Sequence, residues 1–208
     1  MSSTRLLILG AVRIFQPVHG YFVRRELLTW RVDQWASINP GSIYGALRTL
    51  TRDGFLEEVA RESSGTAPAR TQYRLTADGE AEFFALLREA MWRLDRDPAR
   101  LYTAISFMWA LSRDEVIAAL ESRLAQVDAQ RREIPYLHAA LLEGGDTPRH
   151  IAEIAHLDSA VLDGVREWTA ACLERVRGGA YAFAGEPWEG DLGPEPPGRG
   201  STDAASQA

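Results

Sequence analysis

Residues 39–56 read Asn-Pro-Gly-Ser-Ile-Tyr-Gly-Ala-Leu-Arg-Thr-Leu-Thr-Arg-Asp-Gly-Phe-Leu, and they hold a helix start, an amphipathic helix, a helix end and a strand start. Asn39 and Ser42 can cap the free N–H groups of a helix, and the Pro-Gly pair between them sets the turn before it. Gly54 supplies the left-handed residue that ends the helix. This stretch therefore predicts a helix that leads directly into a β-strand.

The predicted helix has two chemically different faces. At about 100° per residue, one sector is apolar and faces a core: Ile43, Ala46, Leu47 and Leu50. The opposite side carries Gly45, Arg48 and Arg52, flanked by Tyr44 and Thr49. Arginine reads guanine edges and binds phosphates, and a glycine lets the helix backbone approach a ligand closely. The face fits a DNA-reading helix, although a surface helix with two solvated arginines would show the same pattern.

Two segments after this helix have strand character. Residues 55–61 and 70–76 favour β-strands, and the loop 62–69 between them consists mainly of small residues. Arg61 and Arg70 flank that loop. Two cations at the tip of a β-hairpin suit a wing that touches the sugar–phosphate backbone.

Two apolar segments upstream, residues 5–12 and 20–28, favour helices separated by a turn at Pro17. The predicted order is helix, helix, recognition helix, strand, strand, which is the order of a winged helix-turn-helix domain over residues 1–80. On this interpretation the DNA-binding residues are Asn39, Ser42, Tyr44, Gly45, Arg48, Thr49, Arg52, Arg61 and Arg70.

Several different short motifs lie along residues 4–90. They are Leu-Leu-Ile-Leu-Gly (6–10), His-Gly-Tyr (19–21), Gly-Ser-Ile-Tyr (41–44) with Leu47 and Leu50, Asp-Gly-Phe-Leu (53–56), and Tyr-Arg-Leu-Thr (73–76) with Gly79. In this combination the chain resembles the PadR family of transcriptional regulators. The resemblance implies a two-fold symmetric dimer that binds an operator, usually as a repressor, and is released by an effector. Gly45, where the family usually carries proline, and Thr51, where it often carries an acid, depart from the pattern, so no operator sequence can be carried over.

The charge of the chain is unevenly distributed. The net charge of −6 argues at first against a nucleic-acid partner. Residues 1–80, however, carry ten arginines against eight acids, or +2, whereas residues 81–208 carry thirteen against twenty-one, or −8. The acidity therefore lies outside the predicted DNA-binding domain.

The length, the hydrophobic content and the single cysteine of the chain limit which class of protein it can be. At 208 residues with 46% hydrophobic side chains, the chain can form one sizeable domain or two small ones. It has no run of 18 apolar residues, and its first five residues lead straight into the first predicted helix, so we expect neither a membrane span nor a secretory signal. Its lone Cys172 fits a reducing cytoplasm, where we expect the protein to act.

The chain beyond residue 80 is predicted to be helical. A connecting helix over 81–97 leads away from the wing, and residues 98–177 form a helical dimerisation domain. Within that domain Ser112 and Glu115 form a capping box that starts a long helix, which Pro135 should kink. A last helix opens at Thr147-Pro148 and packs antiparallel against it.

The tail over 178–208 is rich in Gly, Pro, Ser and acids and is predicted to be disordered, although Tyr181, Phe183 and Trp188 could dock on the folded body.

No enzyme motif stands out. Glu153 and His156 have a spacing that suits a metal, and His150 lies one turn earlier, but no second copy of that pattern exists in the sequence. The chain lacks a Gly-rich phosphate loop, a Cys-x-x-Cys pair and a Gly-x-Ser-x-Gly elbow. We therefore expect no catalytic residues, no metal and no cofactor.

Three aromatic residues near the start of the C-terminal half, Trp92, Tyr102 and Trp109, are candidates for binding a flat aromatic effector. The alternative is that they fill the dimer core. The overall prediction is a mainly α, homodimeric, winged-helix transcriptional regulator that binds double-stranded DNA and no membrane. An interaction module that recognises a partner protein and binds no DNA is the alternative.

Overall fold

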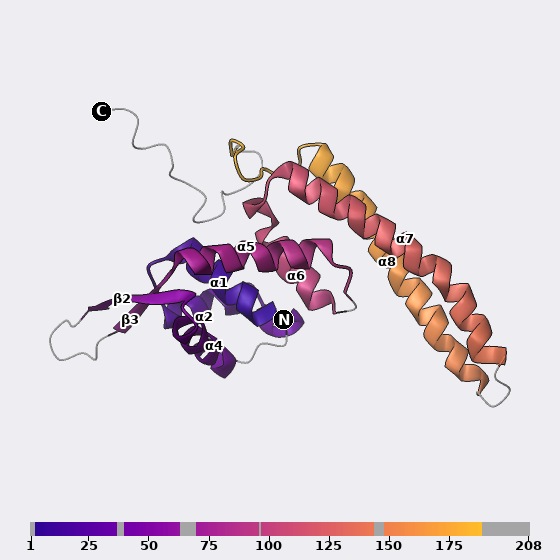
Figure 1. The fold of residues 1–208 in the computed structure, drawn as a ribbon, viewed down its shortest axis with the longest axis horizontal. Helices are drawn as coiled ribbons and strands as arrows, with labels where there is room; N and C mark the ends of the chain where they lie inside the picture. The colour runs from indigo at the N-terminus through magenta and orange to yellow at the C-terminus, as the bar shows by residue number, and fades with distance from the viewer. Residues whose placement is uncertain (1–2, 37–39, 63–69, 96, 144–147, 189–208) are drawn as a thin grey trace.

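The computed structural model describes residues 3–36, 40–62, 70–95, 97–143 and 148–188. Two long extensions leave an N-terminal body in opposite directions (Figure 1). One is the hairpin of strands β2 (Leu56–Glu62) and β3 (Arg70–Leu75), and the other is the pair of helices α7 (Arg113–Glu143) and α8 (Glu153–Arg177).

The N-terminal body is built on helix α1 (Ser3–Phe15), whose central residues are almost completely buried. Helices α2 (Gly20–Thr29) and α4 (Pro40–Arg52) both pack against α1, as the sequence predicted. Between them lies a short helix α3 (Val32–Trp35), which the sequence analysis did not predict. Trp35 at its end donates from Nε1 to the carbonyl of Trp30, which holds the chain just before α4.

The sheet has three antiparallel strands in the order β1-β3-β2. The sequence analysis missed β1 (Val18–His19), because a two-residue strand carries no alternation pattern and exists only through its pairing with β3. Strands β2 and β3 pair from Leu56 opposite Leu75 to Glu62 opposite Arg70, with an irregularity between Glu58 and Ala60. The loop 63–69 that was predicted as the wing tip lies outside the described residues.

Helix α5 (Ala77–Trp92) follows β3 and packs on α1. Helix α6 (Pro98–Phe107) and the single turn η1 (Met108–Ala110) then fold back against the same body. Phe107 is buried with its ring 5.6 Å from that of Phe83 and 6.0 Å from that of Trp30. The segment from Pro98 to Ala110 thus helps to build the N-terminal core.

One hydrophobic cluster runs from α1 to the first half of α7 and includes the end of α8 and Phe183. The predicted boundary between a connecting helix 81–97 and a dimerisation domain 98–177 therefore does not separate two cores within the described residues. That division stays a prediction about assembly.

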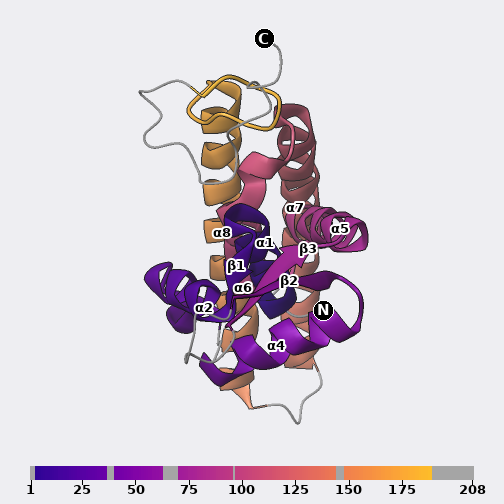
Figure 2. The same cartoon turned by 90° about the vertical axis from the view of Figure 1, so that its left-hand side faces the viewer.

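Helices α7 and α8 form the antiparallel pair that the sequence predicted (Figures 1 and 2). The predicted capping box starts α7: Ser112 N–H donates to Glu115 Oε2 at 3.0 Å, and Glu115 N–H donates to Ser112 Oγ at 3.3 Å. A short turn η2 (Arg149–Ala152) precedes α8.

The segment directly after α8 is ordered, contrary to the prediction of a disordered tail. Residues 178–188 are not a disordered tail, because Phe183 is completely buried and Arg113 binds the segment at several points. The Arg113 guanidinium donates to the carbonyls of Val176 and Tyr181 and to the Glu186 carboxylate. The other expectation, that aromatic side chains of the tail dock on the body, is correct for Phe183, and residues 189–208 lie outside the described part.

Candidate nucleic-acid interface

Helix α4 presents one buried face and one exposed face, as its sequence predicted. Ile43 and Leu47 are completely buried and Leu50 is 2% exposed. The predicted contact residues that lie exposed on the helix are Ser42, Tyr44, Arg48, Thr49 and Arg52, and Gly45 is half-exposed among them. Figure 2 shows α4 lying across one end of the molecule, below the sheet and beside α2. The helix is therefore held by one face and free to meet a partner with the other.

The helix begins at Pro40, two residues before the end of the turn that the sequence predicted. Pro40 is its first residue, where proline costs no hydrogen bond, so the Pro-Gly pair belongs to the helix and not to the turn before it. Gly54 has φ +81° and ends the helix as predicted. Asn39 lies outside the described residues. A Cβ added at Gly45 would touch nothing within 4 Å, so the backbone is open to close approach there.

The two arginines of α4 differ in whether they have an ion-pair partner. Arg52 forms an ion pair with its neighbour Asp53 at 2.9 Å. Arg48 is exposed and has no ion-pair partner in the described part of the chain. Arg48 is therefore the cation on this face whose charge is available to DNA.

Tyr73 joins the recognition helix to the sheet, a role that the sequence analysis did not assign to it. A Cβ at Gly20 would lie 3.4 Å from the ring of Tyr44 and 3.5 Å from that of Tyr73, so both rings lie against the start of α2. Partial burial raises the pKa of the Tyr73 hydroxyl, and the negative charge of Glu58 raises it further. The positive charge of Arg48 lowers it. The hydroxyl therefore stays protonated and can donate a hydrogen bond beside Arg48.

His19 anchors the other edge of β3. Its Nδ1 lies 3.2 Å from the Thr71 carbonyl and its Nε2 lies 3.3 Å from Gln72 Nε2. One neutral tautomer satisfies both contacts, with Nδ1–H as donor and Nε2 as acceptor. The side chain of His19 therefore ties the start of α2 to strand β3 of the wing.

The described part of the wing carries exposed acidic side chains. Glu57 and Glu58 are exposed on β2, and Arg74 on β3 approaches Glu57 at 3.9 Å. The register pairs Arg61 with Thr71 and Arg70 with Glu62, but the side chains of Arg61 and Arg70 lie outside the described residues.

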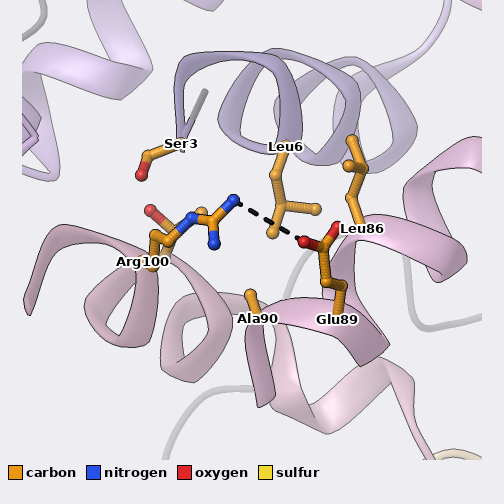
Figure 3. A pocket seen from close by; sticks show the side chains of 7 residues that line it. Ser3, Leu6, Leu86, Glu89, Ala90 and Arg100 are labelled. Atoms are coloured by element: carbon orange, nitrogen blue, oxygen red, sulfur yellow. Dashed lines mark ion pairs between the residues drawn. The ribbon is translucent and has the colours of Figure 1, made fainter. Parts of the chain in front are cut away.

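The three candidate effector residues are not grouped around one cavity in the described structure. Trp92 at the end of α5 is 40% exposed, and Tyr102 on α6 is 47% exposed with its ring 5.9 Å from that of Trp35. Trp109 is half-buried against the core. A recess of about 20 Å³ lies nearby between α1, α5 and α6 (Figure 3), where Arg100 faces Glu89 at 3.7 Å. It has room for about one water molecule and none for an aromatic ring.

The Glu153 and His156 pair forms a local contact of 3.3 Å. His156 also stacks on His138 of α7, with ring centroids 5.1 Å apart. Within the described residues, no group of three or more potential ligands could hold a metal ion. Among those same residues, no helix is long and apolar enough to cross a membrane.

Comparison with solved structures gives several similar chains of low identity. Bacillus subtilis PadR in complex with operator DNA is 20% identical, with 83% of this chain and 98% of that chain covered and a TM-score of 0.36. The same protein in complex with p-coumaric acid is 17% identical, with 84% and 99% covered and a TM-score of 0.34. The protein smu.1604c of Streptococcus mutans UA159 is 16% identical, with 84% and 99% covered and a TM-score of 0.38.

TM-scores below 0.5 do not establish a common overall arrangement, so the family assignment rests on a sequence segment. No curated protein sequence matches the chain. A family model, however, matches the segment that runs from within α1 to within α5 and contains the whole three-stranded sheet and α4. Residues 8–85 of this chain match the model of the transcriptional regulator PadR-like family.

Proposed function

We propose that this protein is a sequence-specific DNA-binding transcriptional regulator that acts as an effector-responsive repressor. The observation that carries the proposal is the exposed, unpaired Arg48 on α4, next to the wing of a PadR-like domain. An α-helix fits the major groove of DNA, and an arginine on its outer face can bind guanine or a backbone phosphate. Tyr44 and Thr49 extend the same face and supply hydroxyl groups for further contacts.

The sheet supports α4 in this role. Strand β2 and helix α2 both pack against α4, so the helix is held from two sides. The exposed Glu57 and Glu58 oppose close approach of phosphates to the middle of β2. We therefore infer that the wing meets the DNA backbone through its tip, with Arg61 and Arg70, and not along its length.

The acting form in this proposal is a homodimer on a palindromic operator. Helix α8 carries an exposed apolar stripe in which Ile154 is 53%, Leu157 65% and Val161 54% exposed. Their spacing of three and four residues is that of a seam between helices. Large apolar side chains at that spacing are typical of a protein interface, and a second copy of α8 related by a two-fold axis is the partner that we propose.

A gel shift with the DNA upstream of the protein's own gene, repeated in rising salt, tests the proposal. A regulator of this kind shifts specific DNA at low protein concentration, and its affinity falls steeply as the salt concentration rises, because binding releases counterions from the phosphates. Competition with unrelated DNA gives the specificity. Absence of any salt-dependent shift would favour the alternative, a winged helix that recognises a partner protein.

The proposed effector response involves the exposed aromatic rings of α5 and α6. The exposed rings of Trp92 and Tyr102 could contact an aromatic molecule, but the nearby recess is too small to enclose one. We propose that such a molecule binds where a second copy covers these rings. Titration of tryptophan fluorescence with phenolic and polycyclic compounds, with Trp92→Leu as the control, tests this placement.

A further inference from the structure

The α7–α8 hairpin contains a cleft of about 380 Å³ midway along its length. Both helices line it, with Asp128, Arg131, Arg132, Ile134 and Pro135 from α7 and Ser159 from α8. Its volume falls in the range of small-molecule sites, which is roughly 300–1,000 Å³. It is separate from the proposed DNA-binding face, which lies on α4.

The cleft also lies away from the apolar stripe of α8. At about 100° per residue, Ser159 lies roughly opposite Leu157 around the helix. Dimerisation through the stripe therefore leaves the cleft on the other flank of the hairpin.

The lining has an uncompensated positive charge. Asp128 is bound by Arg166 at 2.8 Å, and Arg131 is bound by Asp163 at 2.5 Å. Arg132 lines the same cleft and interacts with the charge of Asp128, but it makes no ion pair or hydrogen bond with any described residue. Three arginines therefore share two aspartates, and the guanidinium of Arg132 is the one without a direct partner that an anion can bind.

A hydroxyl group also lines the cleft. The Ser159 hydroxyl forms no hydrogen bond with any described residue, so it can donate one to a bound anion. The side chains of Ile134 and Pro135 supply an apolar surface beside it.

We propose that this cleft is a binding site for a small organic anion with a compact apolar part. The anionic group pairs with Arg132 and accepts a hydrogen bond from Ser159, and the apolar part packs on Ile134 and Pro135. Because the lining comes from both helices, a bound anion braces α7 against α8 at this level. The site does not depend on DNA binding by α4.

The experiment uses the full-length protein and cyclohexanecarboxylate as the probe, with cyclohexanemethanol as a neutral probe of nearly the same shape. Binding is measured by saturation-transfer NMR and calorimetry. The carboxylate is expected to bind saturably in the millimolar range and the alcohol to bind at least about tenfold more weakly, because only the carboxylate forms a charge-assisted contact with Arg132.

Substitutions distinguish this cleft from other surfaces. Arg132→Gln should weaken carboxylate binding by about tenfold, and Ser159→Leu, which fills the cleft, should abolish it. Arg149→Gln removes the same charge from an exposed position outside the cleft and should leave binding unchanged. Circular dichroism shows whether each variant keeps its helices. No saturable binding, equal binding of the alcohol, or full binding by folded Arg132→Gln protein would each overturn the proposal.

Discussion

Arg48 and Arg52 lie one helical turn apart on the exposed face of α4, yet they are not equivalent. Asp53 neutralises Arg52 at 2.9 Å, whereas Arg48 lies beside Tyr73 without a carboxylate partner. A DNA phosphate or base must compete with Asp53 for Arg52 but can bind Arg48 directly. The free energy of DNA binding should therefore depend more on Arg48.

Arg48→Ala is expected to weaken operator binding by roughly 1–3 kcal/mol if the arginine reads a base, and to weaken all DNA binding evenly if it binds a phosphate. Arg52→Ala should have a smaller effect because its charge is already paired. Quantitative gel shifts with specific and unrelated DNA measure both. Arg149→Ala removes the same charge from the α7–α8 hairpin and is the control. If the Arg48→Ala protein binds operator normally, the DNA-binding surface does not include Arg48.

Gly79 illustrates a residue that packing alone requires. A Cβ at this position would lie 2.0 Å from the backbone carbonyl oxygen of Phe55, which cannot move away without shifting the start of β2. Gly79→Ala should therefore lower the free energy of unfolding by about 1–3 kcal/mol or more. Chemical denaturation measures it. Gly45→Ala is the matched control, since its Cβ meets nothing and alanine should stabilise the helix by up to about 1 kcal/mol. If the two variants are equally stable, Gly79 does not lie as close to the Phe55 carbonyl as the structure shows.

At the scale of elements, the segment 178–188 acts as part of the fold. Arg113 at the start of α7 binds the carbonyl of Tyr181 at 2.7 Å and the carboxylate of Glu186 at 2.7 Å, and its guanidinium lies 5.0 Å from the Phe183 ring centroid. Phe183 itself belongs to the main hydrophobic cluster. Composition predicted disorder here because the segment lacks an apolar period, but a single buried aromatic needs no period.

Deletion of residues 178–208 is therefore expected to destabilise the protein. Loss of one completely buried phenylalanine typically costs about 3–5 kcal/mol, and Phe183→Ala should show a similar decrease. Deletion of residues 189–208 alone, where the composition still predicts disorder, should leave the melting temperature nearly unchanged. Differential scanning calorimetry compares the three proteins. A chain ending at residue 177 that melts like the full-length protein would show that the docked segment contributes nothing.

At the scale of the whole molecule, the N-terminal body and the α7–α8 hairpin share one hydrophobic cluster. Phe107 of α6 packs between Trp30 and Phe83, so a chain cut after α5 would lose part of its core as well as the hairpin. Truncation before residue 98 is therefore a poor test of dimerisation. Single surface substitutions on the hairpin avoid this problem.

Leu157→Asp should weaken self-association by about 100-fold or more, because it places a carboxylate in the apolar seam proposed between two copies of α8. Sedimentation equilibrium measures the dissociation constant. Ser159→Asp introduces the same charge on roughly the opposite side of α8 and should leave the oligomeric state unchanged. A Leu157→Asp protein that remains a tight dimer would require a different interface.

The sequence by itself determined those features that depend on residues a few positions apart. The two faces of α4, the left-handed Gly54 and the Ser112–Glu115 capping box follow from helical periodicity and local hydrogen bonding, and the structure contains all three. Motifs along residues 4–90 also indicated the family whose model matches residues 8–85.

Only the tertiary structure decided features that depend on residues far apart in the chain. It paired β1 with β3, brought Tyr73 to the recognition helix, docked Phe183 in the core and formed the cleft between α7 and α8. Local pattern could not reveal them because each arises from two segments that meet only after folding.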